Sequence, residues 1–255
     1  MIPTQKNIAK LQAKKRAQKH VTARRPGVHS KIADNFIESA ITHSNISALK
    51  TIYYLSTILT EGDLEHKQDQ DIIKLTIDKR QTLQYTEMTA PTLIRTARQM
   101  QETSITFVDE DEVIEGMALV PRYRFVPNRN TIEIDLYVRI ARMIVAVKKQ
   151  YTHMNIKELM HLKKAHSIRM LALLNLIAKD VDGSEKTRYM TLEELQAFFG
   201  VHYANWNEVE RKIIRPVKDE LDTHASRSFV YEAEYEALGK GRPGFKRVQI
   251  VVIDR

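Results

Sequence analysis

The segment 206–224 carries side chains that bind nucleic acid, at a spacing that brings them together. Arg211, Arg215 and Lys218 follow one another at steps of four and three, so a helix would place them on one face, with Lys212 beside them. A helix fits the major groove of B-DNA, where arginine can pair bidentately with guanine and lysine can meet guanine or phosphate. These four residues are therefore candidates for contact with DNA.

The same segment has a second, apolar face that would anchor it to the protein. Its members recur at steps of three and four: Trp206, Val209, Ile213, Val217 and Leu221. Asn205 is predicted to cap the helix, whose free amides could bind a phosphate. Pro216 removes one backbone donor, so we expect a kink or a shift of the last turns. The alternative is a solvated surface helix, because acids dilute the basic row: Glu208, Glu210, Asp219 and Glu220.

A second basic cluster lies at 239–247, where three glycines accompany four basic residues: Lys240, Arg242, Lys246 and Arg247. Two predicted strands flank this tip, which makes it a flexible hairpin tip, or wing, suited to phosphate contacts that position a protein without reading sequence. A phosphate-binding P-loop is excluded, because Phe245 follows Gly244 where lysine is required and the segment joins two strands.

The first half of the chain offers a thinner set of basic residues on two predicted helices: Lys79 and Arg80 on the first, Arg95 and Arg98 on the second. A predicted hairpin adds Arg122, Arg124 and Arg129. These residues suit DNA contact, but a role in binding a partner or in dimerisation fits them equally well.

Signatures of catalysis are missing from the sequence. The nine histidines form no His-x-His pair, and there is no HExxH or GxSxG pattern. Without cysteine the chain has no thiolate nucleophile, no cysteine zinc site and no disulfide. We therefore expect no catalytic residues, no metal and no cofactor, and a protein that is not an enzyme.

The elements that must position the basic residues follow one order in each half. The first half predicts helices over 32–41 and 49–59, a strand at 72–75, and helices capped by Asp78 and Thr89. A strand at 104–108, a hairpin of 113–126 with 131–137, and a helix over 138–147 follow. The second half predicts a buried helix over 161–178, a helix over 192–199 with a capping box at Thr191, the helix from Trp206, and strands at 228–235 and 246–253.

Helix, turn, helix and hairpin is the order of a winged helix-turn-helix. We therefore predict an α+β protein with two tandem winged helix-turn-helix domains. The predicted division is a basic N-terminal arm over residues 1–29, a first winged-helix domain over 30–150 for DNA contact and dimerisation, and a second over 151–255 as the main DNA-reading domain.

Charge is distributed unevenly over the 255 residues. Residues 1–29 hold eight of the 40 Lys and Arg residues and no acid, so the remaining 32 basic residues equal the 32 Asp and Glu residues. A basic arm before a neutral body suggests a nucleic-acid partner, with a solvated tail as the alternative. There is no apolar run long enough for a membrane span and no signal-peptide core, so we expect a cytoplasmic protein and no membrane contact.

One stretch reads Leu-Lys-Lys-Ala-His-Ser-Ile-Arg-Met-Leu at 162–171. A downstream set reads Met-Thr-Leu-Glu-Glu-Leu at 190–195, Phe-Phe-Gly-Val at 198–201, Arg-Lys-Ile-Ile-Arg-Pro-Val-Lys-Asp-Glu-Leu at 211–221 and Phe-Val-Tyr-Glu at 229–232. These stretches resemble the iteron-binding plasmid replication initiators of the Rep_3 (RepB-type) family, and the downstream set is closer to diagnostic. The resemblance is strong over about 160–253, moderate over about 31–150, and does not reach the arm.

This resemblance implies two winged-helix domains on directly repeated origin sites, or iterons. It implies a protein that opens a plasmid origin and recruits the host initiator and the replicative helicase. It also implies monomers that initiate and dimers, formed through the first domain, that repress. The reading residues it implies are Asn207, Arg211, Lys212 and Arg215 in the second domain, and Arg95 and Arg98 in the first.

Three other functions stay open. A winged-helix transcriptional regulator without a replication role would share the fold. A rolling-circle nickase would use one of the ten tyrosines as its nucleophile. A structural module could use tandem winged helices to bind protein.

Overall fold

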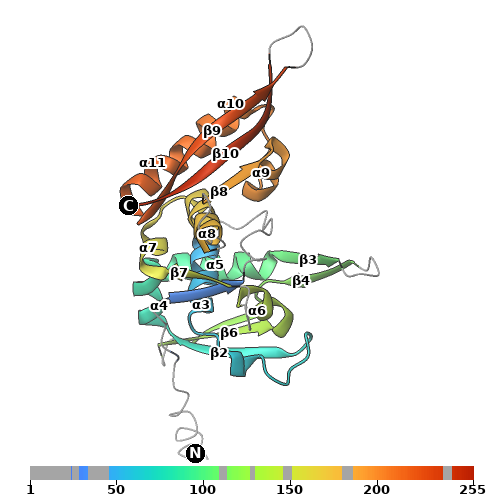
Figure 1. The fold of residues 1–255 in the computed structure, drawn as a ribbon. Coiled ribbons are helices and arrows are strands. Elements are labelled where there is room, and N and C mark those ends of the chain that lie inside the picture. The colour runs from blue at the N-terminus through green and yellow to red at the C-terminus, as the bar shows by residue number, and fades with distance from the viewer. Residues whose placement is uncertain are drawn as a thin grey trace, which may run out of the picture.

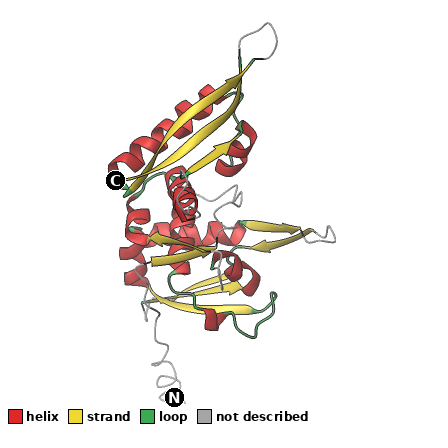
Figure 2. Ribbon diagram, in the orientation of Figure 1, coloured by secondary structure: helices red, strands yellow, loops and turns green. Residues whose placement is uncertain are grey.

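The computed structural model describes residues 24, 29–33, 46–108, 114–126, 130–145, 151–179, 186–237 and 243–255. The molecule is elongated, with one sheet at each end and helices α3 and α8 between them (Figures 1 and 2). The mixed helix and strand content confirms the α+β class.

The first half runs from β1 (His29–Ala33) and α3 (Ile46–Ser56) to a 3-10 turn at Glu61–Asp63 and then β2 (Ile72–Asp78). It continues with α4 (Lys79–Thr86), α5 (Ala90–Glu102), β3 (Ser104–Val108) and β4 (Ile114–Ala118). It ends with β5 (Arg122–Val126), β6 (Thr131–Tyr137) and α6 (Val138–Ile144). Strands β2, β6 and β5 form a three-stranded antiparallel sheet with β6 in the centre, and β3 pairs with β4.

The second half runs from β7 (Tyr151–Asn155) and α7 (Ile156–His161) to α8 (Ala165–Lys179), β8 (Thr187–Met190) and α9 (Leu192–Phe199). A long helix follows as α10 (Trp206–Val209), the π-helical segment η4 (Glu210–Ile214) and α11 (Arg215–His224). Strands β9 (Arg227–Glu236) and β10 (Gly244–Asp254) complete an antiparallel sheet ordered β8-β10-β9.

One sequence of elements therefore occurs twice: a strand, two helices, and two strands of which the last is central in its sheet. In the first half these are β2, α4, α5, β5 and β6, with β3 and β4 inserted before β5. In the second half they are β8, α9, α10–α11, β9 and β10. In the second half, α11 packs against β9, the first strand of the last hairpin.

The apolar core runs through both halves, because α3 and α8 contact each other and α7 also packs against α3. Ile52 of α3 and Met170 and Leu174 of α8 have no exposed surface, which confirms the prediction of a buried helix near 170–178. β1 pairs with β7, so a strand before α3 joins one after residue 150. The division into domains at residue 150 stays a prediction.

Three predicted elements differ in the structure. The helix predicted over 32–41 is wrong at its start, because residues 29–33 form β1. Its partner β7 lies some 120 positions away, so local periodicity could not indicate the pairing. Residues 34–45 lie outside the described residues. The hairpin predicted from 113–126 is split: β4 pairs with β3, and only β5 pairs with β6. Pro121 lies between β4 and β5, where its missing N–H and fixed φ favour an interruption.

The third difference concerns the helix predicted over 161–178. It is α8, which begins only at Ala165: His161 is the last residue of α7, and Leu162–Lys164 separate the two helices. The backbone N–H of Lys163 donates to the Glu220 carboxylate, 2.6 Å away. The side-chain ammonium of Lys164 donates to the carbonyl of Pro216 at 2.7 Å. These contacts with α11 hold the chain in a turn that a continuous helix would not allow.

Candidate nucleic-acid interface

The helix α10–η4–α11 is held in place by its apolar face. The five residues predicted to form this face are all buried: Trp206, Val209, Ile213, Val217 and Leu221. The ring of Trp206 stacks on Phe245 of β10, with centroids 4.8 Å apart and planes 9° apart. Asn205 caps the helix by accepting from the N–H of Glu208 at 3.1 Å, as its sequence position predicted. The start of the helix is therefore fixed against the last strand.

A buried carboxylate fixes the other end of this helix. Glu220 of α11 is 8% exposed and accepts from the N–H of Lys163 at 2.6 Å and from the hydroxyl of Ser167 at 2.5 Å. Both donors belong to the turn that opens α8, and Ser167 is fully buried. Because α8 packs in the centre of the molecule, these two hydrogen bonds set the orientation of α11 relative to the core.

Pro216 does not end the helix, although it changes its hydrogen bonding. The residues before it form the π-helical segment η4, in which the N–H of Arg215 donates to the carbonyl of Glu210, five residues earlier. The wider turn accommodates the proline, which offers no N–H to the carbonyl of Lys212. The predicted perturbation is thus a local widening within a continuous helix.

The exposed face of this helix contains both free and paired side chains. Asn207 and Arg211 are exposed, and neither side chain has a partner among the residues that the structure describes. Arg215 pairs with Glu210 at 2.9 Å, Lys212 with Glu208 at 3.2 Å, and Lys218 with Asp222 at 2.6 Å. Lys212 also lies over the ring of Tyr203, 4.5 Å from its centroid. The Lys212–Glu208 pair is partly exposed on both sides, and exposed ion pairs contribute little, about 0–1 kcal/mol, so a phosphate can displace Glu208.

Acidic neighbours also accompany the described part of the wing. Lys246 lies 3.5 Å from Glu236, and Arg247 lies 2.7 Å from Glu234. Hydrogen bonding to Glu234 raises the pKa of Arg247 above its ordinary value. Lys240 and Arg242, the other two residues predicted for the wing, lie outside the described residues.

The basic residues on α4 and α5 of the first half are less often paired with acids than those of the second half. Arg95 and Arg98 are exposed on α5, which occupies the place that α10–α11 holds in the second half. Arg80 is exposed and Lys79 partly exposed on α4. None of these four side chains has an ion pair with another described residue. By contrast, Arg122 and Arg124 on β5 face Asp135 and Glu133 of β6, at 3.0 Å and 3.4 Å; Arg129 lies outside the described residues.

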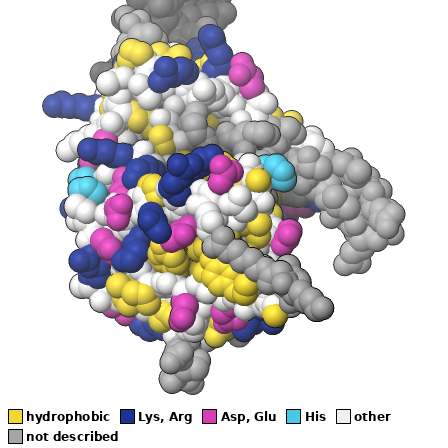
Figure 3. All heavy atoms as spheres, turned by 90° about the horizontal axis from the view of Figure 1, so that it is seen from above, with side chains coloured by type: hydrophobic (Ala, Val, Ile, Leu, Met, Phe, Trp, Pro, Cys, Tyr) yellow, Lys and Arg dark blue, Asp and Glu magenta, His cyan; other side chains and the backbone are white. Residues whose placement is uncertain are grey.

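The charge on the surface is mixed accordingly. Figure 3 shows Lys and Arg side chains gathered across one face of the molecule, with Asp and Glu side chains among them. Such a surface offers local cationic positions in place of a uniform basic field. No described helix is long and apolar enough to cross a membrane.

The family of the chain follows from its sequence. The model of the family described as Initiator Replication protein, WH1 (Rep3_N) matches residues 31–175, more than half of the chain. The chain belongs to this family. No curated protein matches it at a significant level.

Among solved structures, this initiator is similar to the crystal structure of Pi initiator protein in complex with iteron DNA. The TM-score is 0.66 at 11% sequence identity, and the similarity covers 90% of this chain and 99% of that one. At this identity the similarity shows the fold. It covers more of the chain than the family match does.

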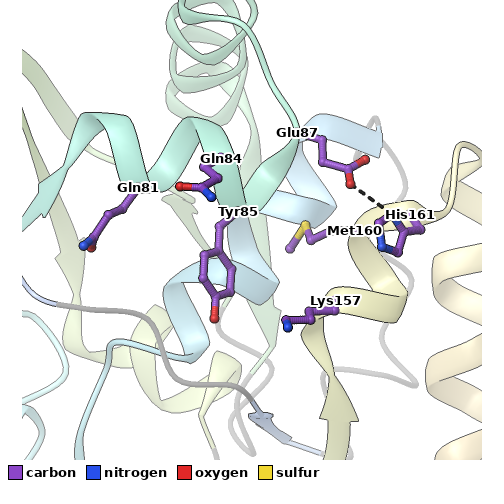
Figure 4. Close-up of a pocket in the computed structure, with 7 residues that line it drawn as sticks. All are labelled: Gln81, Gln84, Tyr85, Glu87, Lys157, Met160 and His161. Carbon is purple, nitrogen blue, oxygen red and sulfur yellow. Dashed lines mark ion pairs between the residues drawn. The ribbon is translucent and has the colours of Figure 1, made fainter.

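The initiator also has a pocket of about 450 Å³ between α4 and α7. Figure 4 shows Lys157 and Met160 of α7 pointing toward Tyr85 of α4, while Glu87 and His161 meet at 2.9 Å beside them. None of the predicted site residues lines this pocket, and the described residues contain no cluster of acids and histidines suited to a metal. The pocket marks where the two halves meet.

Two residues of the interface were missed by sequence reasoning. Glu210 entered it only as an acid that dilutes the basic row, and Tyr231 only as part of an aromatic strand. In the structure the Tyr231 hydroxyl donates to the Glu210 carboxylate at 2.9 Å, and the same oxygen accepts from Arg215. Arg215 and Glu210 are five apart, a spacing that an α-helix does not bring together, so no local pattern could have indicated the contact.

Proposed function

We propose that this chain is a plasmid replication initiator that binds iteron DNA through two tandem winged-helix domains. The observation that carries the proposal is its fold, which follows an initiator crystallised on iteron DNA over 90% of the chain. Membership of the initiator family and the twofold occurrence of strand, two helices and hairpin support it.

In this proposal each domain places its second helix in a major groove. The second domain uses Asn207, Arg211, Lys212, Arg215 and Lys218 on its helix and Lys240, Arg242, Lys246 and Arg247 on its wing. The first domain uses Arg95 and Arg98 of α5, with Lys79 and Arg80 of α4 near the DNA backbone. Arg211 is exposed without an ion pair in the described structure, so it can reach a base edge without breaking a contact.

The proposed setting is the plasmid origin in a bacterial cytoplasm. There the initiator would self-associate through its first domain and recruit the host initiator and the replicative helicase. It would act by binding and opening DNA, with no catalytic step of its own.

The test of DNA reading measures the affinity of the full chain for a tandem-repeat duplex from its replicon and for a scrambled duplex. Arg211→Ala should weaken binding to the repeat by about 1–3 kcal/mol and relax preference at one base pair. Equal weakening on both duplexes would make Arg211 a phosphate contact. Deletion of the arm should reduce the salt dependence of binding, because the arm is proposed to contact phosphates. The deletion takes residues 1–23 of the arm's 1–29, since Arg24 pairs with Asp63 and His29 begins β1.

The test of initiation is genetic. A plasmid that carries the origin and this gene should replicate, and the same plasmid with Arg211→Ala should be lost. Plasmid maintenance without the gene would favour a transcriptional regulator. A covalent tyrosine–DNA adduct on supercoiled origin DNA with divalent metal would show a nickase, and failure to bind any duplex at low salt would favour a protein-binding module.

A further inference from the structure

Arg215 is held by a hydrogen-bonded group that is unlike the surroundings of the other basic residues on its helix. Its Nε and Nη2 both donate to one oxygen of Glu210, at 3.1 Å and 2.9 Å. The Tyr231 hydroxyl donates to the same oxygen at 2.9 Å, from strand β9. The ring of Tyr231 is in turn placed by Trp206, with centroids 6.2 Å apart. The Glu210 carboxylate is mostly buried, with 20% of its side chain exposed, while 65% of the Arg215 side chain is exposed.

The π-helical segment makes this group possible. In an α-helix, two residues five apart point in directions that differ by about 140°. In η4 the N–H of Arg215 closes a turn on the carbonyl of Glu210, so positions 210 and 215 lie one above the other. Pro216 favours the wider turn because it has no N–H to close the α-helical hydrogen bond to residue 212. The proline therefore contributes to the position of the Arg215 side chain.

The contact uses only one edge of the guanidinium. Nε and Nη2 face Glu210, whereas Nη1 has no hydrogen bond to any described residue. The end formed by Nη1 and the second hydrogen of Nη2 is left as a planar pair of donors. Such a pair matches the N7 and O6 acceptors of guanine in the major groove.

We propose that Glu210 and Tyr231 are positioning residues that orient Arg215 to read a guanine. This inference rests on the proposed function, DNA binding by α10–η4–α11. Holding the guanidinium in advance lowers the entropy lost when it pairs with a base. Lys212 and Lys218 also form ion pairs with carboxylates. An ammonium group, however, is a point charge without the planar set of donors that makes the orientation of a guanidinium matter. Arg215 thereby becomes the oriented reader of this helix.

The alternative role of Glu210 is that of a competitor, which occupies Arg215 and repels phosphate. The two roles predict different effects of Glu210→Gln. Loss of a competitor strengthens binding to every duplex and leaves sequence preference unchanged. Loss of a positioning carboxylate removes the preference for one guanine, even though the protein gains positive charge.

The experiment is a selection of DNA by the full-length chain. A pool of duplexes randomised over about 20 base pairs, two turns of the double helix, is enriched on the protein and sequenced. The variants are Glu210→Gln, Tyr231→Phe, Arg215→Ala and Pro216→Ala. Glu208→Gln is the matched control, because it removes an acid that pairs with Lys212 on the same helix. Thermal unfolding and the affinity for the unselected pool identify any variant that fails to fold.

The expected result is one guanine position that wild type selects and Arg215→Ala does not. Preference at that position should fall by about fivefold to a hundredfold in Glu210→Gln, and less in Tyr231→Phe and Pro216→Ala, with Glu208→Gln unchanged. Full guanine preference in Glu210→Gln, with tighter binding to all sequences, would overturn the inference and leave the proposed function intact. Enrichment of no sequence by wild type would overturn both.

Discussion

The two hydrogen bonds accepted by Glu220 give the sharpest test of how the helix α10–η4–α11 is held in place. Substituting Glu220 with alanine removes two hydrogen bonds that join α11 to the turn before α8, at 2.6 Å and 2.5 Å. A hydrogen bond to a charged group contributes about 1.5–3 kcal/mol. The two bonds should not contribute equally, because their donors differ in access to water.

Lys163 is exposed, so water can replace the carboxylate at its N–H, and that bond should contribute near the lower end, about 1.5 kcal/mol. Ser167 is fully buried, so its hydroxyl would lose its acceptor without compensation, which costs near the upper end, about 2–3 kcal/mol. Glu220→Ala should therefore lower the free energy of unfolding by about 4 kcal/mol. For a chain of this size that corresponds to a fall in Tm of roughly 10 °C.

The assay is urea unfolding followed by the fluorescence of Trp206, the single tryptophan of the chain, which lies in the same helix. Glu220→Gln keeps one carbonyl oxygen for Ser167 and should lose about 1–2 kcal/mol. Asp219→Ala is the matched control: the neighbouring carboxyl group is exposed, and its substitution should cost at most about 0.5 kcal/mol.

A double-mutant cycle with Ser167→Ala isolates the buried bond. The two substitutions should be strongly non-additive, since each removes the same interaction. If Glu220→Ala costs no more than Asp219→Ala, or if its effect adds simply to that of Ser167→Ala, the carboxylate does not hold α11 in the way described.

Three further predictions concern other parts of the chain. Burial raises the pKa of Asp63, but hydrogen bonds from Arg24 and Thr60 outweigh burial and bring its pKa to about 2, below the ordinary 3.8. The stabilising effect of ionised Asp63 should therefore be present above pH 4 and be lost between about pH 4 and 2. The free energy of unfolding of Arg24→Ala should be about 1 kcal/mol below that of wild type, because Arg24 is partly exposed, and this difference should shrink over the same pH range. A difference that stays constant with pH would contradict the assignment. Thr191→Ala removes one side of the capping box at α9 and should cost about 1 kcal/mol in urea unfolding, whereas Thr223→Ala, at an exposed position of α11, should cost less. Phe245→Leu removes the ring stacked on Trp206 and should shift the tryptophan emission to longer wavelength as water reaches the indole; an unchanged spectrum would show that the stack does not shield it.

Sequence predicted best those features that arise from neighbours a few residues apart. The caps at Asp78, Thr89, Thr191 and Asn205 all form the expected side-chain to N–H bonds, because each joins residues three positions apart. The apolar face of α10–α11 was predictable for the same reason. Burial of that face requires only that the helix forms beside some core.

Features that depend on distant partners were missed or changed. β1 is a strand because β7 supplies its hydrogen bonds, and β4 pairs with β3 because Pro121 separates it from β5. The break before α8 depends on Glu220, more than 50 residues later. No window of the sequence contains these partners, so periodicity assigned each segment its locally preferred state.

The candidate site shows the same division. Which residues are basic and which share a helix face could be read from spacing, yet whether each cation is free could not. The structure leaves Arg95 and Arg98 of α5 without ion pairs to other described residues, whereas Lys212 and Lys218 of the second helix each lie beside a carboxylate. A phosphate that meets Lys218 must displace Asp222, whereas one that meets Arg98 displaces only water and counterions. The less conspicuous basic set therefore offers the more available charge, and α5 should contribute to affinity for DNA of any sequence at least as much as the helix that carries the more diagnostic motif.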